Sequence, residues 1–164
     1  MAALLRVCPL LGATSSMTFV ACEDFFIRPL APAPQSDLRP HANRLLPAHG
    51  RWLWPGLGVV GASWGLSIAT TIANLRLPVA GSQGGAADKW YRAGLCFSAL
   101  HFVFGYRAMW LLWTIRKDGN DDEDENKDNV AYMKAWLRLN VWRGVLADLP
   151  SWLCYFVAFV LATE

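Results

Sequence analysis

The sequence predicts an all-α fold, an integral membrane four-helix bundle, and three observations support this prediction. Apolar residues make up 54% of the chain and charged residues only 17%, whereas soluble domains average about 25% charge. Four long apolar stretches recur, at about 4–22, 52–75, 91–115 and 140–162. Each is long enough to cross a hydrocarbon layer of ~30 Å at ~1.5 Å per residue. Prolines and acidic residues gather between them, so we expect residues 1–164 to form a single four-span domain.

The first stretch is the least regular of the four. It contains Arg6, Pro9 and Gly12, and its FVAC ending at Cys22 faintly resembles a bacterial lipoprotein cleavage site. A cleaved secretory leader is therefore one reading. We favour a retained helix, because three more apolar stretches follow and a fourth completes a bundle.

Two connections differ sharply in composition. Residues 25–51 are rich in proline and basic residues, and the fixed φ angles of proline disfavour a long helix there. We expect an ordered or partly helical loop that acts as a lid or strap. Residues 116–129 form an acidic loop whose glycine precedes the acids, so the loop departs from a calcium-binding pattern. Counting Lys and Arg beside the spans predicts that both termini lie outside the cytosol.

The two remaining helices carry packing signals. Small residues recur through 52–75 and let helix backbones approach closely, so this span should be the most tightly packed. The last helix begins near Asn129 as an amphipathic segment and runs into the final span. Pro150 should kink that span or break it.

Several polar side chains lie inside or beside the spans, where each buried ion costs about 2.5–3.5 kcal/mol at the bilayer centre. We expect them to face the interior of the bundle. These residues are Glu23, Asp24, His101, Arg107, Asn140, Arg143 and Asp148. On the last helix, Trp136, Asn140 and Arg143 share one face by their i, i+4 and i+7 spacing.

Each of these polar residues can be interpreted either as structural or as part of a catalytic site. Arg107 and Arg143 could pair with Asp24 or Asp148 and only fix the register of the helices. His101 could be a hydrogen-bonded structural residue, although histidine is the side chain best suited to proton transfer near neutral pH. Both readings remain open on the sequence alone.

The chain has nine tryptophans, and a belt of aromatic residues at the membrane interfaces explains most of them. Trp110, Trp136 and Trp142 lie near the polar residues and could also form the walls of a site for a flat aromatic ligand. The four cysteines are scattered singly, and no metal-ligand spacing or dinucleotide motif occurs. We therefore predict no metal, no cofactor and no nucleic-acid partner.

Three features occur together in this chain. The first helix leads into a Pro-rich segment, the third span carries a histidine and an arginine, and the segment MKAWLRLNVWRG follows at residues 133–144. This pattern resembles the anthrone-oxygenase-like family of small four-helix membrane proteins, which is common in fungal secondary-metabolite clusters and related to a bacterial membrane domain family. The most specific part is the frame of Trp136, Asn140 and Arg143.

The resemblance implies oxidation of a polyketide anthrone, or a similar phenolic intermediate, to a quinone by O2 without metal or flavin. His101 would be the base, and Arg107, Asn140 and Arg143 would stabilise the phenolate. Trp110, Trp136 and Trp142 would bind the aromatic substrate. It also implies a multi-pass protein of the endoplasmic reticulum or another endomembrane, with homo-oligomers left open.

The alternative is a non-catalytic membrane scaffold or a small carrier associated with a biosynthetic pathway. A carrier should show two similar halves with helices broken at matching positions. Pro150 is expected to break only the fourth span, with no matching break in the other half of the chain. A scaffold therefore ranks above a carrier.

Overall fold

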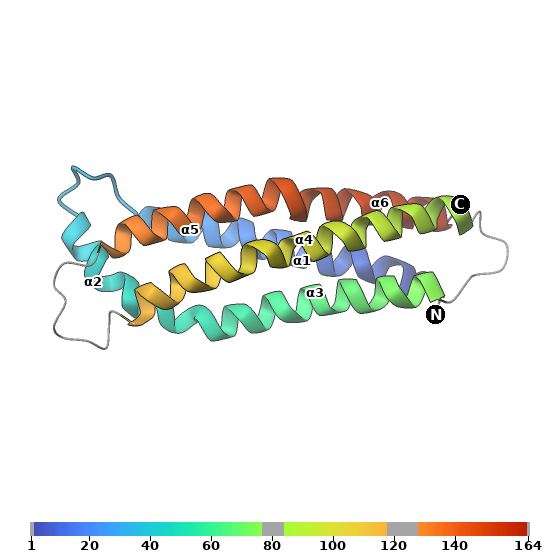
Figure 1. Ribbon diagram of the computed structural model, residues 1–164, viewed down its shortest axis with the longest axis horizontal. Helices are drawn as coiled ribbons and strands as arrows, with labels where there is room; N and C mark the ends of the chain where they lie inside the picture. The colour runs from blue at the N-terminus through green and yellow to red at the C-terminus, as the bar shows by residue number, and fades with distance from the viewer. Residues whose placement is uncertain (1, 77–83, 118–127, 164) are drawn as a thin grey trace.

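A computed structural model describes residues 2–76, 84–117 and 128–163, and within these ranges every regular element is helical (Figure 1). The all-α prediction is confirmed. The elements in chain order are α1 (Ala2–Ile27), η1 (Arg28–Leu30), α2 (Arg39–His49), η2 (Gly50–Trp52), α3 (Leu53–Arg76), α4 (Gly84–Lys117), α5 (Asn129–Arg143), the π-helical turn η3 (Gly144–Asp148) and α6 (Leu149–Thr163).

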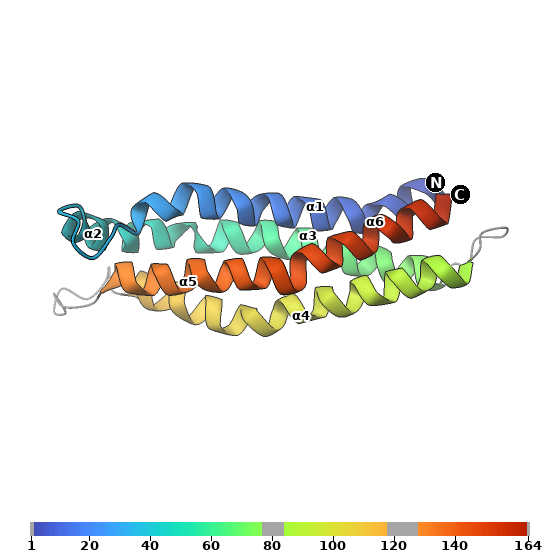
Figure 2. The same ribbon diagram turned by 90° about the horizontal axis from the view of Figure 1, so that it is seen from above.

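Four long rods run up and down side by side, and α5, η3 and α6 together make the fourth (Figure 1). Both termini lie at one end of the bundle, and α2 lies across the other end (Figure 2). All four rods are long and apolar enough to cross a membrane. The expected bundle of four long apolar helices is therefore what the chain forms.

The distribution of side chains suits lipid. Large apolar side chains such as Phe25, Val103 and Tyr106 are exposed, whereas small polar ones such as Ser67 and Ser98 are buried. Packing in a bilayer cannot rely on hiding apolar surface from water, so small residues and hydrogen bonds between helices take over that role.

The proline-rich connection is partly helical, as expected. Pro40 occupies the first turn of α2, where a missing N–H costs nothing. Arg39 forms an ion pair with Asp128, and the Asn43 side chain accepts a hydrogen bond from the Val130 N–H at 2.9 Å. These contacts attach the proline-rich connection to the start of α5. Most of the acidic loop, residues 118–127, lies outside the described ranges.

Pro9 lies inside α1, where it leaves the Leu5 carbonyl without its usual donor. The Asn74 side chain of α3 donates to that carbonyl at 2.8 Å, and the Ser67 hydroxyl donates to the Pro9 carbonyl at 2.9 Å. Helix α3 therefore supplies partners to two carbonyls of α1, and the two backbones approach closely beside Gly12.

A side chain at Gly12 has no room. A Cβ atom there would lie 2.4 Å from the Ser67 hydroxyl and 2.6 Å from the Ser63 carbonyl. Gly12→Ala should therefore destabilise the bundle by about 1–3 kcal/mol through overpacking, measured as thermal unfolding in detergent. Gly65→Ala is the control, because nothing lies within 4 Å of its Cβ position. Equal melting temperatures for the two variants would contradict this account of the contact.

The last helix continues through Pro150 instead of breaking. The irregularity lies in the preceding turn, η3, where the Leu149 N–H bonds to the Gly144 carbonyl five residues back. Proline removes one helical hydrogen bond and crowds the carbonyl four residues earlier, and a wider π turn accommodates both effects.

Candidate active site

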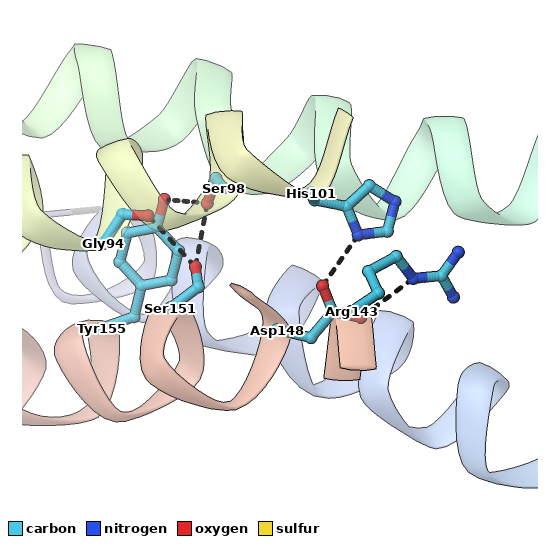
Figure 3. A network of polar contacts seen from close by, with 7 residues as sticks. All are labelled: Gly94, Ser98, His101, Arg143, Asp148, Ser151 and Tyr155. Atoms are coloured by element: carbon cyan, nitrogen blue, oxygen red, sulfur yellow. Dashed lines mark hydrogen bonds and ion pairs between the residues drawn. The ribbon is translucent and has the colours of Figure 1, made fainter. Parts of the chain in front are cut away.

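A histidine, an aspartate and an arginine meet in the middle of the bundle (Figure 3). The His101 Nδ1 of α4 lies 2.8 Å from Oδ1 of Asp148, and both side chains are buried. The Arg143 Nε lies 3.5 Å from the other carboxylate oxygen, Oδ2. His101 and Arg143 therefore share the carboxylate of Asp148.

The π turn explains how Arg143 and Asp148 come to face the same site. Residues five apart on a regular α-helix are separated by ~500°, or ~140° around the axis. A turn closed by an i to i+5 bond reduces that angle. The π turn η3 spans Gly144–Asp148, so the two side chains meet.

The pairing fixes what the histidine can do. An ionised carboxylate only accepts hydrogen bonds, so the imidazole donates its Nδ1–H to Asp148. The second ring nitrogen of His101, Nε2, then carries the basic lone pair and points away from Asp148 (Figure 3). A carboxylate in this position also stabilises the imidazolium once a proton is taken up.

An apolar cavity of about 370 Å³ borders this group. It runs along α4 from His101 to Leu112, about 16 Å at the rise of a helix, toward the end covered by α2. Its volume falls in the usual range for small-molecule sites. The lining residues that carry the argument are Glu23, His49, Gly61, His101, Gly105, Trp136 and Arg143.

Three side chains of this site had no role in the sequence-based hypothesis. Trp64 is buried on α3, and its ring lies 4.5 Å from the His101 ring between centroids. It limits how the imidazole can turn. Glu23 lines the cavity close enough to Arg143 for their charges to interact. The one sign of Glu23 in the sequence was its position as an acidic residue directly after an apolar stretch.

His49 is the third, at the end of α2, where it helps to cover the cavity. Burial lowers the pKa of His49, so the ring is neutral at neutral pH. Nothing in the sequence distinguishes it from the exposed His41, because both lie in the same proline-rich segment.

The seven residues that the sequence predicted for the site do not all lie together in the structure. His101, Arg143 and Trp136 line the same cavity, whereas the buried Asn140 lines a second one. The chemical roles of these four stay predictions.

The other three lie on the outside of the bundle. Arg107 is exposed, with its guanidinium carbon 4.3 Å from the centre of the Trp110 ring, and Trp110 and Trp142 are also exposed. The expectation that Arg107 faces the interior is therefore wrong. The cation–π contact with Trp110 offsets part of the cost of its position.

Within the described ranges, no three His, Cys, Asp or Glu side chains gather closely enough to hold a metal ion. The expectation of a reaction without metal or cofactor is not tested by this and stays a prediction.

Fold and site together define a class: a small four-helix protein of membrane type, with a buried His–Asp–Arg group at one end of an apolar cavity. The chain is 34% identical to a protein named probable epoxidase scpX from Mollisia scopiformis, over 97% of this chain and 96% of that protein. It is 32% identical to epoxidase gkaX from Penicillium citrinum, over 97% and 94% of the two chains. It is 28% identical to epoxidase pydX from an Acremonium species, also over 97% and 94%. The chain belongs to the family of these fungal epoxidases.

No family model and no solved structure match the chain. The relatives' names agree with the prediction of an oxidoreductase at the level of reaction class. They name epoxidation and do not mention anthrones. Anthrone oxidation therefore remains a hypothesis.

Proposed function

We propose that the protein is a membrane-embedded epoxidase of fungal secondary metabolism, which transfers one oxygen atom of O2 to a carbon–carbon double bond of an apolar small molecule. The observation that carries the proposal is the apolar cavity that ends on the His101–Asp148 pair. Kinship with proteins named epoxidases supplies the reaction type.

The balance of the reaction defines what the site must supply. An alkene, O2, two electrons and two protons give an epoxide and one water. The O–O bond breaks, one oxygen forms two bonds to carbon, and the other leaves as water. The electrons come from a two-electron donor of the quinol or reduced nicotinamide class.

His101 and Arg143 suit two parts of this chemistry. Protonated at Nε2, His101 donates to the oxygen that leaves as water, and Asp148 stabilises the charged ring at 2.8 Å. The Arg143 guanidinium lines the same cavity and stabilises negative charge as oxygen is reduced. The apolar walls exclude water and strengthen both interactions.

The cavity also indicates how an apolar substrate enters. Phe102 and Tyr106 line it and are exposed on the outer face of α4. Between them and α3, Gly61 and Gly105 line the cavity with open space at their Cβ positions. A side opening at this place lets a lipophilic molecule enter directly from the bilayer.

A bulky residue in this opening should obstruct the substrate. We expect Gly105→Trp to raise KM about tenfold, equivalent to ~1.4 kcal/mol of binding, in assays with the protein in lipid nanodiscs. Gly65→Trp is the matched control, because Gly65 also has open space around it but does not line the cavity. The same KM in both variants would contradict entry through this opening.

Isotope labelling tests the reaction itself. Purified protein in nanodiscs should convert an alkene-bearing polyketide under ¹⁸O2, given a reductant, to an epoxide with one ¹⁸O atom. The second labelled atom should appear in water. An epoxide oxygen derived from water, or no epoxide from any alkene tested, would contradict the proposal.

Oxidation of an anthrone is the second candidate. A CH2 group and O2 give a carbonyl group and one water, so this reaction needs no external electrons. The basic Nε2 of His101 favours it, because the activated CH2 must lose a proton first, and Arg143 in the same cavity could stabilise the phenolate. Turnover of an anthrone without reductant would select this reaction. Failure of both substrate classes would favour a non-catalytic scaffold.

A further inference from the structure

The Arg143 guanidinium lines the apolar cavity with hydrogen-bond donors that the chain itself leaves unused. The residue is only 6% exposed, and its side chain makes no hydrogen bond within the described ranges. Asp148 compensates the charge, but the 3.5 Å between Nε and Oδ2 is longer than a usual hydrogen bond. The two terminal nitrogens point away from the carboxylate (Figure 3). A ligand in the cavity can therefore satisfy them.

Such unpaired donors favour a ligand that carries an acceptor oxygen. Burying a charged donor without a partner is costly, and hydrogen bonds to charged groups are stronger than those between neutral groups. A guanidinium has five N–H groups in a fixed fork. Arg143 can therefore hold a ligand oxygen and still have donors for the oxygen that is reduced.

Glu23 supplies an acceptor on the wall of the same cavity. It is partly buried, it lines the cavity, and its charge interacts with that of Arg143. Within the described ranges, however, the ion pair of Arg143 is with Asp148. In either protonation state a carboxyl group keeps an oxygen that can accept a hydrogen bond. A donor and an acceptor thus face the cavity across a gap that their own side chains do not close.

A secondary amide has the right chemistry and size for this gap. Its oxygen and nitrogen are about 2.3 Å apart, so hydrogen bonds of ~2.9 Å on both sides span roughly 5–8 Å. Two charges still interact over such a distance inside a protein. A carboxylate would suit Arg143 alone, because it has no donor for Glu23 and adds a negative charge beside it.

We propose that the substrate carries a neutral polar head group of the secondary-amide class, whose carbonyl oxygen accepts from Arg143 and whose N–H donates to Glu23. This inference rests on the proposed function, which makes the cavity the substrate site. The hydrocarbon part of the substrate lies against the apolar remainder of the wall, which includes Val60, Met109 and Leu112. Glu23 and Arg143 thereby select the substrate by its head group.

The head-group preference can be measured without turnover. The probes are straight-chain alkenes about as long as the cavity that end in a secondary amide, in the corresponding N-methylated tertiary amide, or in a carboxylate. We expect the secondary amide to bind about tenfold more tightly than either of the others, the usual effect of one hydrogen bond to a charged group. The measurement is equilibrium binding of radiolabelled probe to the protein in lipid nanodiscs, corrected for partition into empty nanodiscs. Equal affinities, or tighter binding of the carboxylate, would overturn the proposal.

Variants of Glu23 separate the hydrogen bond from the size of the added methyl group. Glu23→Leu removes the acceptor and should bind the secondary and tertiary amides equally, whereas Glu23→Gln keeps an acceptor oxygen and should retain the preference. Asp24→Leu is the matched control, because this neighbouring acid pairs with Arg28 and does not line the cavity. A preference that survives Glu23→Leu would come from size alone and would overturn the proposal.

Arg143→Lys tests the other half of the site. Lysine keeps a positive charge for Asp148 but lacks the planar fork. We expect both amides to bind about tenfold more weakly to this variant, with the preference between them unchanged. A melting temperature close to that of the wild type would show that the fold is intact. Wild-type affinity for both amides would overturn the role of Arg143.

The outcomes separate this inference from the proposed function. Epoxides formed from all three probes with the same kcat/KM would support the epoxidation and overturn the head-group site. Selective binding of the secondary amide, with no epoxide formed from it under ¹⁸O2 and a reductant, would support the head-group site and contradict the epoxidation.

Discussion

His101→Asn is expected to lower kcat by about 10²–10⁴, the usual contribution of a positioned general acid or base. The asparagine amide can donate the same hydrogen bond to Asp148 that Nδ1 donates at 2.8 Å. It offers no basic nitrogen in place of Nε2. The variant should therefore keep the buried pairing and lose the proton transfer, measured as product formed by the purified protein in nanodiscs.

A matched control separates the chemistry from the fold. His41→Asn makes the same change on the exposed surface of α2 and should leave kcat unaltered. His101→Asn should melt within a few degrees of the wild type, because the hydrogen bond to Asp148 persists. If His101→Asn turns over at the wild-type rate, His101 is a structural residue and the site has no acid–base role for it.

The fold was predictable from the sequence because a bilayer imposes one strong requirement. Every backbone polar group in lipid must be satisfied within the chain, so long apolar stretches become helices. The helices extend past the apolar stretches: α1 continues to Ile27 and takes Glu23 into the bundle. A prediction from hydropathy ends the first span at its first acidic residue, Glu23. The helix itself continues to Ile27, just before the prolines that begin at Pro29.

The division between inner and outer residues was harder to predict. His101 and Arg107 are six residues apart, ~600° of rotation and so ~120° around the axis. That angle allows a broad shared face, yet only one of the two can point at the centre of the bundle. The structure has His101 inside and Arg107 outside. A sequence pattern cannot fix the rotation of one helix against its neighbours.

The sequence allowed Asp148 to pair with Arg143, and the ion pair at 3.5 Å confirms this, but the hydrogen bond between Asp148 and His101 was not predicted. Regular helical geometry places Asp148 on another face from Arg143, and only the π turn brings them together. Pro150, two residues later, was the signal that the turn is irregular. The sequence showed where the helix departs from regularity, but the kind of departure depends on packing between the helices.

Removing the shared carboxylate should have the largest effect on stability. We expect Asp148→Leu to lower the free energy of unfolding by about 3–5 kcal/mol, because Arg143 keeps a buried charge without its partner. For a chain of this size that corresponds to a fall of roughly 6–20 °C in melting temperature, measured by thermal unfolding in detergent. Activity should be lost as well, since His101 loses the group that orients it.

The contrast with two other variants shows whether buried charge is the cause. In Arg143→Met/Asp148→Leu both charges are removed, and replacing a buried ion pair by apolar residues of similar size is often neutral. The double variant should therefore recover much of the lost stability while remaining inactive. Arg28→Gln breaks an exposed ion pair with Asp24 and should leave the melting temperature unchanged. A double variant no more stable than Asp148→Leu would mean that packing around the π turn, and not the unpaired charge of Arg143, determines the loss.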